Sequence, residues 1–440
     1  MRILILNPEK KTKHRISKDT SGGYGTGNNF GESLIPRILM RLIKKYSDWP
    51  PVYVAYTFSV LEHKGHSVEY EKELPDNIEG YDLFIVVSSI VCCETELAVI
   101  KKLTKANKKV FVIGPFASNM PKLYNDVNGT VILGEPEFYF LNNDNFDLDL
   151  KKQIVSFQHN LNLDDLPYPK WDKILSKKNN VNKLFGNYKS VPILATRGCP
   201  FSCSKYCVYP LQQGKKVRQR NVKHIVDEME YWNKKFQVQM FVFRDPVFSI
   251  NRKHTIEFCK ELYERKLDIK FVIETHLKIL DSELIKLLKK SGLKAVKVGI
   301  ESADTEVMKK ESRYTIEKDQ QLSKIRELEK NKIQVSSMYI IGFPSDNNET
   351  VINTIDYAIK LNTTYAQFSI WTPYPGTPIF HEYKNKIIEN SYESFDQYRL
   401  VFKHDTFDSK KVRNLLDRAY TKYYSRIGWM LKYFKSFLYA

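Results

Sequence analysis

Short blocks of apolar and polar positions alternate through the first third of the chain. Mostly apolar runs, which predict strands, lie at 2–7, 66–73, 83–89, 109–114 and 130–135. Stretches with helical periodicity lie at 34–46, 52–64 and 94–106. Such an alternation predicts a parallel sheet covered by helices on both faces. A sheet of this kind binds ligands beyond the C-terminal ends of its strands.

A second alternation begins near residue 190. Its predicted strands lie at 191–196, 239–244, 269–274, 295–300, 334–341 and 366–371. The clearest helix between them follows Asp281 as its N-terminal cap and ends at Gly292, the residue types that favour those positions. Six strands with five crossovers predict a partial (β/α)6 barrel of the TIM type, whose chemistry lies at the strand C-terminal ends.

The pattern lapses between these two regions, around residues 153–187. Residues 164–169 (Asp-Asp-Leu-Pro-Tyr-Pro) indicate an extended connector, because each proline disfavours the helical region for the residue before it. We therefore expect a Rossmann-like α/β domain at 1–150, a linker at 151–189, the partial barrel at 190–385 and a helical, basic region at 386–440. Residues 420–438 mix aromatic and basic side chains, which fits a helix packed on the barrel or a membrane-surface or partner helix.

Composition places the chain among globular proteins. Its 440 residues suggest about three domains, at roughly 150 residues each, and 42% hydrophobic content excludes wholesale disorder. The net charge of +18 would suit nucleic acid or an anionic membrane, but the excess is mostly lysine spread along the chain, so nucleic acid is an unlikely partner. The longest apolar run, 83–93, is too short for a bilayer span of about 20 residues. We expect a cytoplasmic protein without a transmembrane segment.

A cluster of cysteines carries the most specific chemistry. Cys199, Cys203 and Cys207 follow the first predicted barrel strand, so they lie at the expected catalytic mouth. A 4Fe–4S cube takes thiolate ligands, and three thiolates leave one iron open for the amino and carboxylate groups of S-adenosylmethionine (SAM). Zinc, which typically takes four ligands, and unrelated thiols are the alternatives. We expect Cys92 and Cys93, and separately Cys259, to be packing residues.

The chain resembles the cobalamin-binding radical SAM family over nearly its full length. The cysteine loop is the specific part, and four further segments resemble family motifs in the expected order: 164–169, 299–302 (Gly-Ile-Glu-Ser), 341–344 (Ile-Gly-Phe-Pro) and 372–378 (Thr-Pro-Tyr-Pro-Gly-Thr-Pro). The usual loop has two residues between its second and third cysteines, whereas this one has three. The extra residue moves the third thiol by up to about 3.5 Å if the chain is extended.

The resemblance implies roles for residues at the barrel strand ends. It implies Asp245 for the ammonium of SAM, Arg244 for the carboxylate, Glu274 or Glu301 for the ribose, and Tyr209 with Gly342 for the adenine. A carboxylate at a strand end is also often a helix cap or half of an ion pair, and this alternative stays open.

For the first domain, the resemblance implies a cobalamin-binding module. The loops that contain Gly23, Ser89 and Gly114 would contact the corrin and its nucleotide tail. The chain lacks the Asp-x-His-x-x-Gly motif whose histidine ligates cobalt, so the lower cobalt face would be unligated or held by water. A Rossmann-like domain that has lost the cofactor, or one that binds a nucleotide, is the alternative.

The implied activity is methylation of an unactivated carbon through a 5′-deoxyadenosyl radical, by a monomer with an external electron donor such as flavodoxin or ferredoxin. Cyclisation, ring contraction or another rearrangement is the alternative within the family. An iron–sulfur or zinc protein that binds nucleic acid is the alternative of another class. The substrate would be a small or lipid-like molecule, and the basic C-terminal region leaves peripheral membrane contact open.

Overall fold

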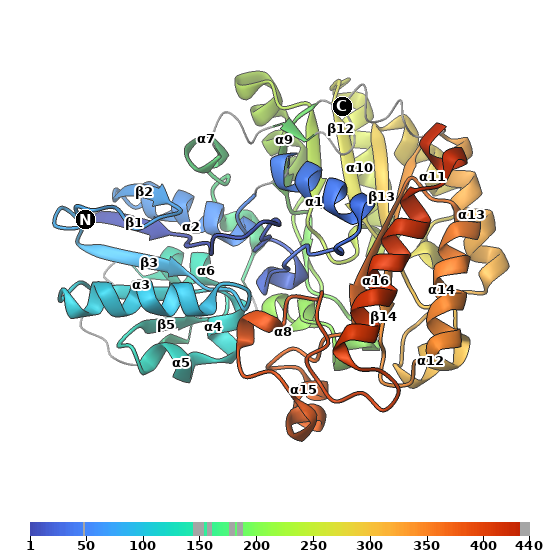
Figure 1. Ribbon diagram of the computed structural model, residues 1–440. Coiled ribbons are helices and arrows are strands. Elements are labelled where there is room, and N and C mark those ends of the chain that lie inside the picture. Colours follow the sequence, from blue (N-terminus) through green and yellow to red (C-terminus); the bar gives the residue numbers. More distant parts are fainter. Residues whose placement is uncertain (47–48, 144–153, 156–160, 176–180, 183–187, 432–440) are drawn as a thin grey trace.

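The computed structural model describes residues 1–46, 49–143, 154–155, 161–175, 181–182 and 188–431. These residues form two α/β units side by side (Figure 1). The predicted α/β class, with a Rossmann-like domain followed by a half-open barrel, is confirmed.

The first unit is built on a parallel six-stranded sheet in the order β2-β1-β3-β4-β5-β6. Its strands are β1 (Arg2–Leu6), β2 (Ser67–Glu71), β3 (Leu83–Val87), β4 (Val110–Ile113), β5 (Thr130–Leu133) and β6 (Ile154–Val155). Its helices are α2 (Val52–His63), α3 (Cys93–Lys105), α4 (Pro115–Asn119), α5 (Pro121–Asn125) and α6 (Pro136–Asn142). The central strand β3 is buried throughout, as expected for a parallel sheet covered on both faces.

Residues 7–46 leave this sheet and cross to the second unit. Their helix α1 (Leu34–Tyr46) packs against α16 (Ser409–Tyr424), close to the chain's C-terminal end. Figure 1 shows these two helices side by side in front of the barrel. The crossing segment therefore contacts both units: Tyr24 packs in the core of the first unit, and α1 lies on the barrel side against α16.

The second unit is a half-barrel with strand order β15-β14-β13-β12-β11-β8-β7. Its strands are β7 (Val181–Asn182), β8 (Tyr188–Ile193), β11 (Met240–Phe243), β12 (Lys270–Glu274), β13 (Leu293–Glu301), β14 (Gln334–Ile341) and β15 (Tyr365–Ile370). All neighbouring strands are parallel except β7, which pairs antiparallel with β8. A short antiparallel pair, β9 (Thr196–Arg197) and β10 (Arg218–Gln219), closes the loop after β8.

Helices cover the outer face of the half-barrel (Figure 1). They are α9 (Val222–Phe236), α10 (Arg252–Glu264), α11 (Ser282–Lys290), α12 (Thr305–Lys310), α13 (Lys318–Lys330) and α14 (Asn348–Leu361). The predicted cap Asp281 accepts a hydrogen bond from Leu284 N at 2.9 Å. The short helices α7 (Trp171–Ile174), α8 (Tyr209–Gln213) and α15 (Pro378–Tyr383) lie in connections.

The C-terminal region departs from the prediction of a helical segment beginning at residue 386. Helix α16 begins only at Ser409, and residues 387–408 run as irregular chain with one short 3-10 turn. Tyr398 and Phe402 are buried there, so this segment packs individual aromatic side chains instead of presenting one helical face. Among the described residues, no helix is both long and apolar enough to cross a membrane. The end of the predicted aromatic helix, residues 432–440, lies outside the described residues.

Candidate radical SAM site

The cysteine loop is folded into a compact turn. Cys207 N donates to the carbonyl oxygen of Cys203 at 3.1 Å, and Cys199 N donates to the carbonyl oxygen of Gly214 at 3.1 Å. The three-residue spacing thus places Cys203 and Cys207 one helical turn apart, which absorbs the extra residue. Gly198 has φ +98°, and a side chain there would strike the Lys216 carbonyl. The start of the loop therefore requires glycine.

The three thiols open onto one cavity with about 1530 Å³ of empty space. Within the described residues, no three donors converge on a single metal ion. A 4Fe–4S cube does not need that convergence, because each thiolate binds a different iron. The donor set of Cys199, Cys203 and Cys207 therefore fits a cluster with one open iron.

Arg313 lies against this loop from the segment after α12. Its Nη1 donates a hydrogen bond to Cys203 Sγ at 3.3 Å, and its Nη2 pairs with Glu301 Oε1 at 2.9 Å. The pKa of the Cys203 thiol falls to about 6, first because the Cys207 side chain hydrogen-bonds to it and then because Arg313 is close. The sequence reasoning missed Arg313, which is remote along the chain and belongs to no quoted motif.

Alternate residues of the barrel strands line the same cavity. Lys297, Gly299 and Glu301 face it from β13, with the period of two that a strand imposes. Glu274, at the end of β12, is paired in register with Lys297. Burial raises the pKa of both carboxyls, Glu274 and Glu301. The barrel strands thus bring charged side chains to the same cavity as the cysteines.

The structure brings together most of the predicted SAM residues. Arg244, Glu274, Glu301 and Tyr209 all line the cavity with the three cysteines. Arg244 is also held by the first unit, because its Nη2 pairs with Asp19 Oδ2 at 2.9 Å.

Asp245 does not face the cavity, contrary to the sequence prediction. Its carboxylate accepts hydrogen bonds from the backbone of Ala195, at 3.1 Å, and from the backbone and hydroxyl of Thr196. Arg244 and Asp245 follow the end of β11, and their side chains take different directions: Arg244 lines the cavity, whereas Asp245 binds the backbone after β8. Burial raises the pKa of Asp245 to about 6. Its position is that of a residue that fixes the end of β8.

Gly342 and Ser89 also lie outside the predicted cavities. A Cβ at Gly342 would lie nearest the side chains of Val412 and Ile370. Ile340, near the end of β14, lines the cysteine cavity instead. Ser89 is fully buried, and its hydroxyl donates to Glu96 Oε1 at 2.7 Å. Glu96 in turn pairs with Lys18 at 2.9 Å. Ser89 therefore belongs to a buried polar cluster of the first unit and not to an open surface.

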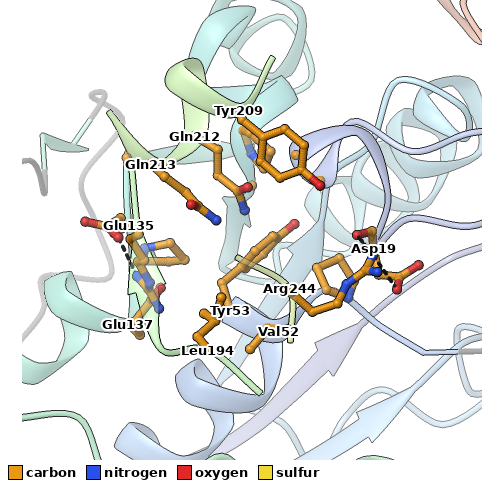
Figure 2. A pocket seen from close by; sticks show the side chains of 18 residues that line it. Asp19, Val52, Tyr53, Glu135, Glu137, Leu194, Tyr209, Gln212, Gln213 and Arg244 are labelled. Atoms are coloured by element: carbon orange, nitrogen blue, oxygen red, sulfur yellow. Dashed lines mark hydrogen bonds and ion pairs between the residues drawn. The ribbon is translucent and has the colours of Figure 1, made fainter. Parts of the chain in front are cut away.

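A second, narrower cavity of about 600 Å³ lies between the two units. Gly23 and Gly114, which the sequence analysis assigns to the cobalamin contact, line this cavity together with Tyr53, Tyr209 and Arg244. Figure 2 shows the Tyr53 and Tyr209 side chains projecting into it from different elements. The buried Tyr53 hydroxyl has no hydrogen-bond partner in the described part of the chain. Gly114 has φ +124°, and a Cβ there would lie 2.7 Å from that hydroxyl.

These features fit contact with part of a large cofactor. Glycine at position 114 leaves the strand end open, and the unpaired Tyr53 hydroxyl can hydrogen-bond to a ligand. The space of about 600 Å³, which includes volume open to solvent, is too small for the whole of cobalamin. Tyr209 and Arg244 line both cavities, so a cofactor of that size would occupy the space of both.

A buried ion network joins the two units at this cavity. Arg197, two residues before the first cysteine of the loop, pairs with Glu135 and, at 2.5 Å, with Glu137. Arg218 binds Glu135 as well, at 2.7 Å. The sequence analysis did not predict this network, whose glutamates come from the first unit and whose arginines come from the second.

Comparison with known proteins agrees with this geometry. Residues 193–358 match the model of the Radical SAM superfamily. The half-barrel of this chain is therefore a radical SAM domain, and such a domain implies a 4Fe–4S cluster and SAM. The predicted resemblance to the cobalamin-binding radical SAM family is confirmed.

Two curated relatives and one solved structure define the likeness further. An uncharacterized methyltransferase of Pyrococcus horikoshii is 29% identical over 275 residues, covering 62% of this chain and 58% of the relative. The anaerobic magnesium-protoporphyrin IX monomethyl ester cyclase of Rubrivivax gelatinosus is 31% identical over 232 residues. This match covers 52% of this chain and 40% of the cyclase. The structure of the cobalamin-dependent SAM radical enzyme OxsB, with aqua-cobalamin bound, has a TM-score of 0.67 at 13% identity. The superposition covers 98% of this chain and 67% of OxsB. The chain thus spans 40–58% of the length of these two curated relatives.

Proposed function

We propose that this protein is a cobalamin-dependent radical SAM methyltransferase that acts on an unactivated carbon. The observation that carries the proposal is that Cys199, Cys203 and Cys207 open onto one cavity at the strand ends of a radical SAM domain. When bound, the cluster and SAM supply a 5′-deoxyadenosyl radical that removes hydrogen from the substrate, and methylcobalamin supplies the methyl group. The protein's part is to bind, orient and shield these groups.

Residues of the barrel would orient SAM. Glu274 and Glu301 are the buried carboxylates that face the cavity, so they are assigned to its ammonium and ribose hydroxyls. Arg244 would bind the SAM carboxylate with the guanidinium nitrogens that Asp19 does not occupy. Tyr209 and Ile340 offer apolar surface to the adenine. Asp245 is left out of this set because its carboxylate is turned toward β8.

The space between the two units would hold cobalamin. Gly23, Gly114 and Tyr53 would contact it on the side of the first unit, and Tyr209 on the side of the barrel. The relatedness in fold to a structure with aqua-cobalamin bound supports this assignment. Arg197 and Glu135 line this space as an ion pair.

A second candidate function keeps the same site but ends in cyclisation or another rearrangement. The likeness to the Rubrivivax gelatinosus cyclase favours it, while the Pyrococcus horikoshii relative, whose match covers more of this chain, is named a methyltransferase. In either reaction, an external electron donor such as flavodoxin or ferredoxin would reduce the cluster of a monomer. All six cysteines are free thiols, which supports a reducing, cytoplasmic location.

The test is SAM cleavage by anaerobically reconstituted full-length protein loaded with hydroxocobalamin and reduced with dithionite. We expect 5′-deoxyadenosine from the wild type and from Cys259→Ala, whose thiol is buried in α10 away from the loop, and none from Cys203→Ala. SAM with a deuterated methyl group should give deuterated methylcobalamin. Deoxyadenosine without methyl transfer to cobalt would favour the rearrangement, and equal cleavage by Cys203→Ala would reject both functions.

A further inference from the structure

A third cavity, of about 980 Å³, lies under the segment that crosses from the first unit to the barrel. We call it the side chamber. Its apolar and aromatic lining comes from the crossing segment, the residue Trp49 shortly before α2, two barrel strands and α16: Phe30, Leu39, Ile43, Trp49, Val242, Tyr365, Ala366, Tyr420 and Tyr424. The proposed function assigns no role to any of these residues.

The aromatic wall of the side chamber is fixed in place. The Phe30 and Tyr420 rings stack with centroids 4.4 Å apart. The hydroxyl of Tyr420 donates to the carbonyl oxygen of Phe368 at 2.9 Å, and that of Tyr424 donates to the carbonyl oxygen of Ala366 at 2.8 Å. Because the edge strand β15 takes up both hydroxyls, these tyrosines offer the chamber apolar ring surface.

The side chamber adjoins the cysteine cavity. Thr20, Arg244, Lys297, Ser336 and Gln367 line both spaces. A molecule seated in the side chamber can therefore extend past these residues into the cavity that the three thiols face. The junction is polar, in contrast to the chamber beyond it.

The charge at the junction is positive. Arg15 and Arg244 both pair with Asp19, at 3.4 Å and 2.9 Å. The Lys297 amine forms no hydrogen bond or ion pair with any residue that the structure describes, although Glu274 faces it from the next strand. One cation at the junction is therefore available to an anionic group of a ligand.

Resting on the proposed function, we propose that the substrate is an amphipathic acid, with an extended apolar body in the side chamber and an anionic group bound by Lys297. The apolar lining of the side chamber accounts for the body, and the unpaired lysine accounts for the anion. The shared wall then holds the substrate beside the cavity in which SAM would be cleaved.

Trp49 provides a direct readout, because it lines the side chamber. The probe is 12-bromododecanoate, whose bromine quenches tryptophan fluorescence at short range, titrated into the full-length protein without cofactors. We expect saturable quenching that is largely lost in Trp49→Phe, where isothermal titration calorimetry should still detect binding. Quenching that does not saturate, or is unchanged in Trp49→Phe, would overturn the proposal.

Two variants of α1 separate the chamber from the protein surface. Ile43 lines the chamber, whereas Leu42, its neighbour on the same helix, is 38% exposed. Ile43→Trp should weaken binding of 12-bromododecanoate at least ten-fold, and Leu42→Trp should leave it within two-fold of wild type. Equal binding by the two variants would place the probe elsewhere on the protein.

Lys297→Met tests the anionic anchor. This variant should weaken the binding of 12-bromododecanoate at least ten-fold and leave the binding of 12-bromododecanol unchanged. An equal effect on the binding of the acid and of the alcohol would reject the anchor. Cofactor-free binding is independent of SAM cleavage. Binding without deoxyadenosine formation by the reconstituted protein would retain the side chamber and reject the proposed function, and the reverse result would reject the side chamber alone.

Discussion

Arg313 donates a hydrogen bond to Cys203 Sγ at 3.3 Å, although the two residues are 110 positions apart. The same guanidinium pairs with Glu301 at 2.9 Å. One arginine thus links the cysteine loop to the carboxylate at the end of β13, and the proposed cluster ligand and the proposed SAM ligand share a partner.

This link predicts an effect on the cluster. Replacing Arg313 with Gln removes a positive charge beside a thiolate ligand, and hydrogen bonds and charge near the sulfurs set the reduction potential. We expect a more negative midpoint potential in redox titration followed by electron paramagnetic resonance (EPR). Arg252→Gln is the control, since Arg252 pairs with Asp281 and Glu283 on the surface. An unchanged potential at full iron content would show that Arg313 does not tune the cluster.

Lys297 predicts a pH-dependent stability change. Burial, followed by the charge of Arg244, lowers its pKa from 10.5 to about 8, with Glu274 and Asp19 opposing and Arg15 adding to the effect. The folded protein therefore binds this proton less tightly than the unfolded chain. Burying the charged amine therefore lowers the free energy of unfolding. This loss is fully present below pH 8 and fades as the pH rises toward 10.5.

Lys297→Met should accordingly raise the free energy of unfolding at pH 7, by at most about 3 kcal/mol, and this gain should shrink between pH 8 and 10.5. Urea titrations of the cofactor-free wild type and variant at several pH values measure this difference in the free energy of unfolding. A gain that stays constant through pH 10 would contradict the titration of Lys297 as its cause.

The Arg197 network predicts strong coupling across the interface of the two units. Arg197→Met leaves Glu137 buried without its partner, and breaking a buried ion pair costs about 3 to 5 kcal/mol. Adding Glu137→Gln to that variant should restore part of the loss, because the stranded charge is removed. Urea unfolding of the two single variants and the double variant measures the coupling, and additive losses would show that Arg197 and Glu137 do not interact.

The cavity between the units predicts how cobalamin binding responds to side-chain size. Val52 lines that cavity at the start of α2. Val52→Trp would fill part of it and should weaken hydroxocobalamin binding at least ten-fold, whereas Val52→Ile should bind as wild type does. Visible absorption of the bound corrin after gel filtration measures this. Equal corrin retention by Val52→Trp would place the cofactor outside this cavity.

Much of the fold was predictable because each element carries its own period. The strands β1 and β3 and the barrel helix after Asp281 lie where the apolar pattern placed them. The irregular course of residues 387–408 was not predicted. The packing of Tyr398 and Phe402 there depends on distant contacts, and no local period encodes them.

The candidate site was predictable where residue type alone decides the chemistry. The cysteine spacing located the loop, and Glu274 and Glu301 lie at strand ends that face the cavity. Asp245 was misplaced because it lies beyond the end of β11, where no strand alternation fixes the direction of a side chain. Arg313 could not be found, since its partner is brought close only by the barrel.

Anaerobic reconstitution with iron and sulfide, followed by elemental analysis and EPR, tests the central claim most directly. The account predicts about four irons and four sulfides per chain, an EPR signal of the reduced cluster that changes when SAM is added, and loss of both in Cys203→Ala but not in Cys259→Ala. Bound zinc without inorganic sulfide, or a cluster signal that SAM leaves unchanged, would contradict it.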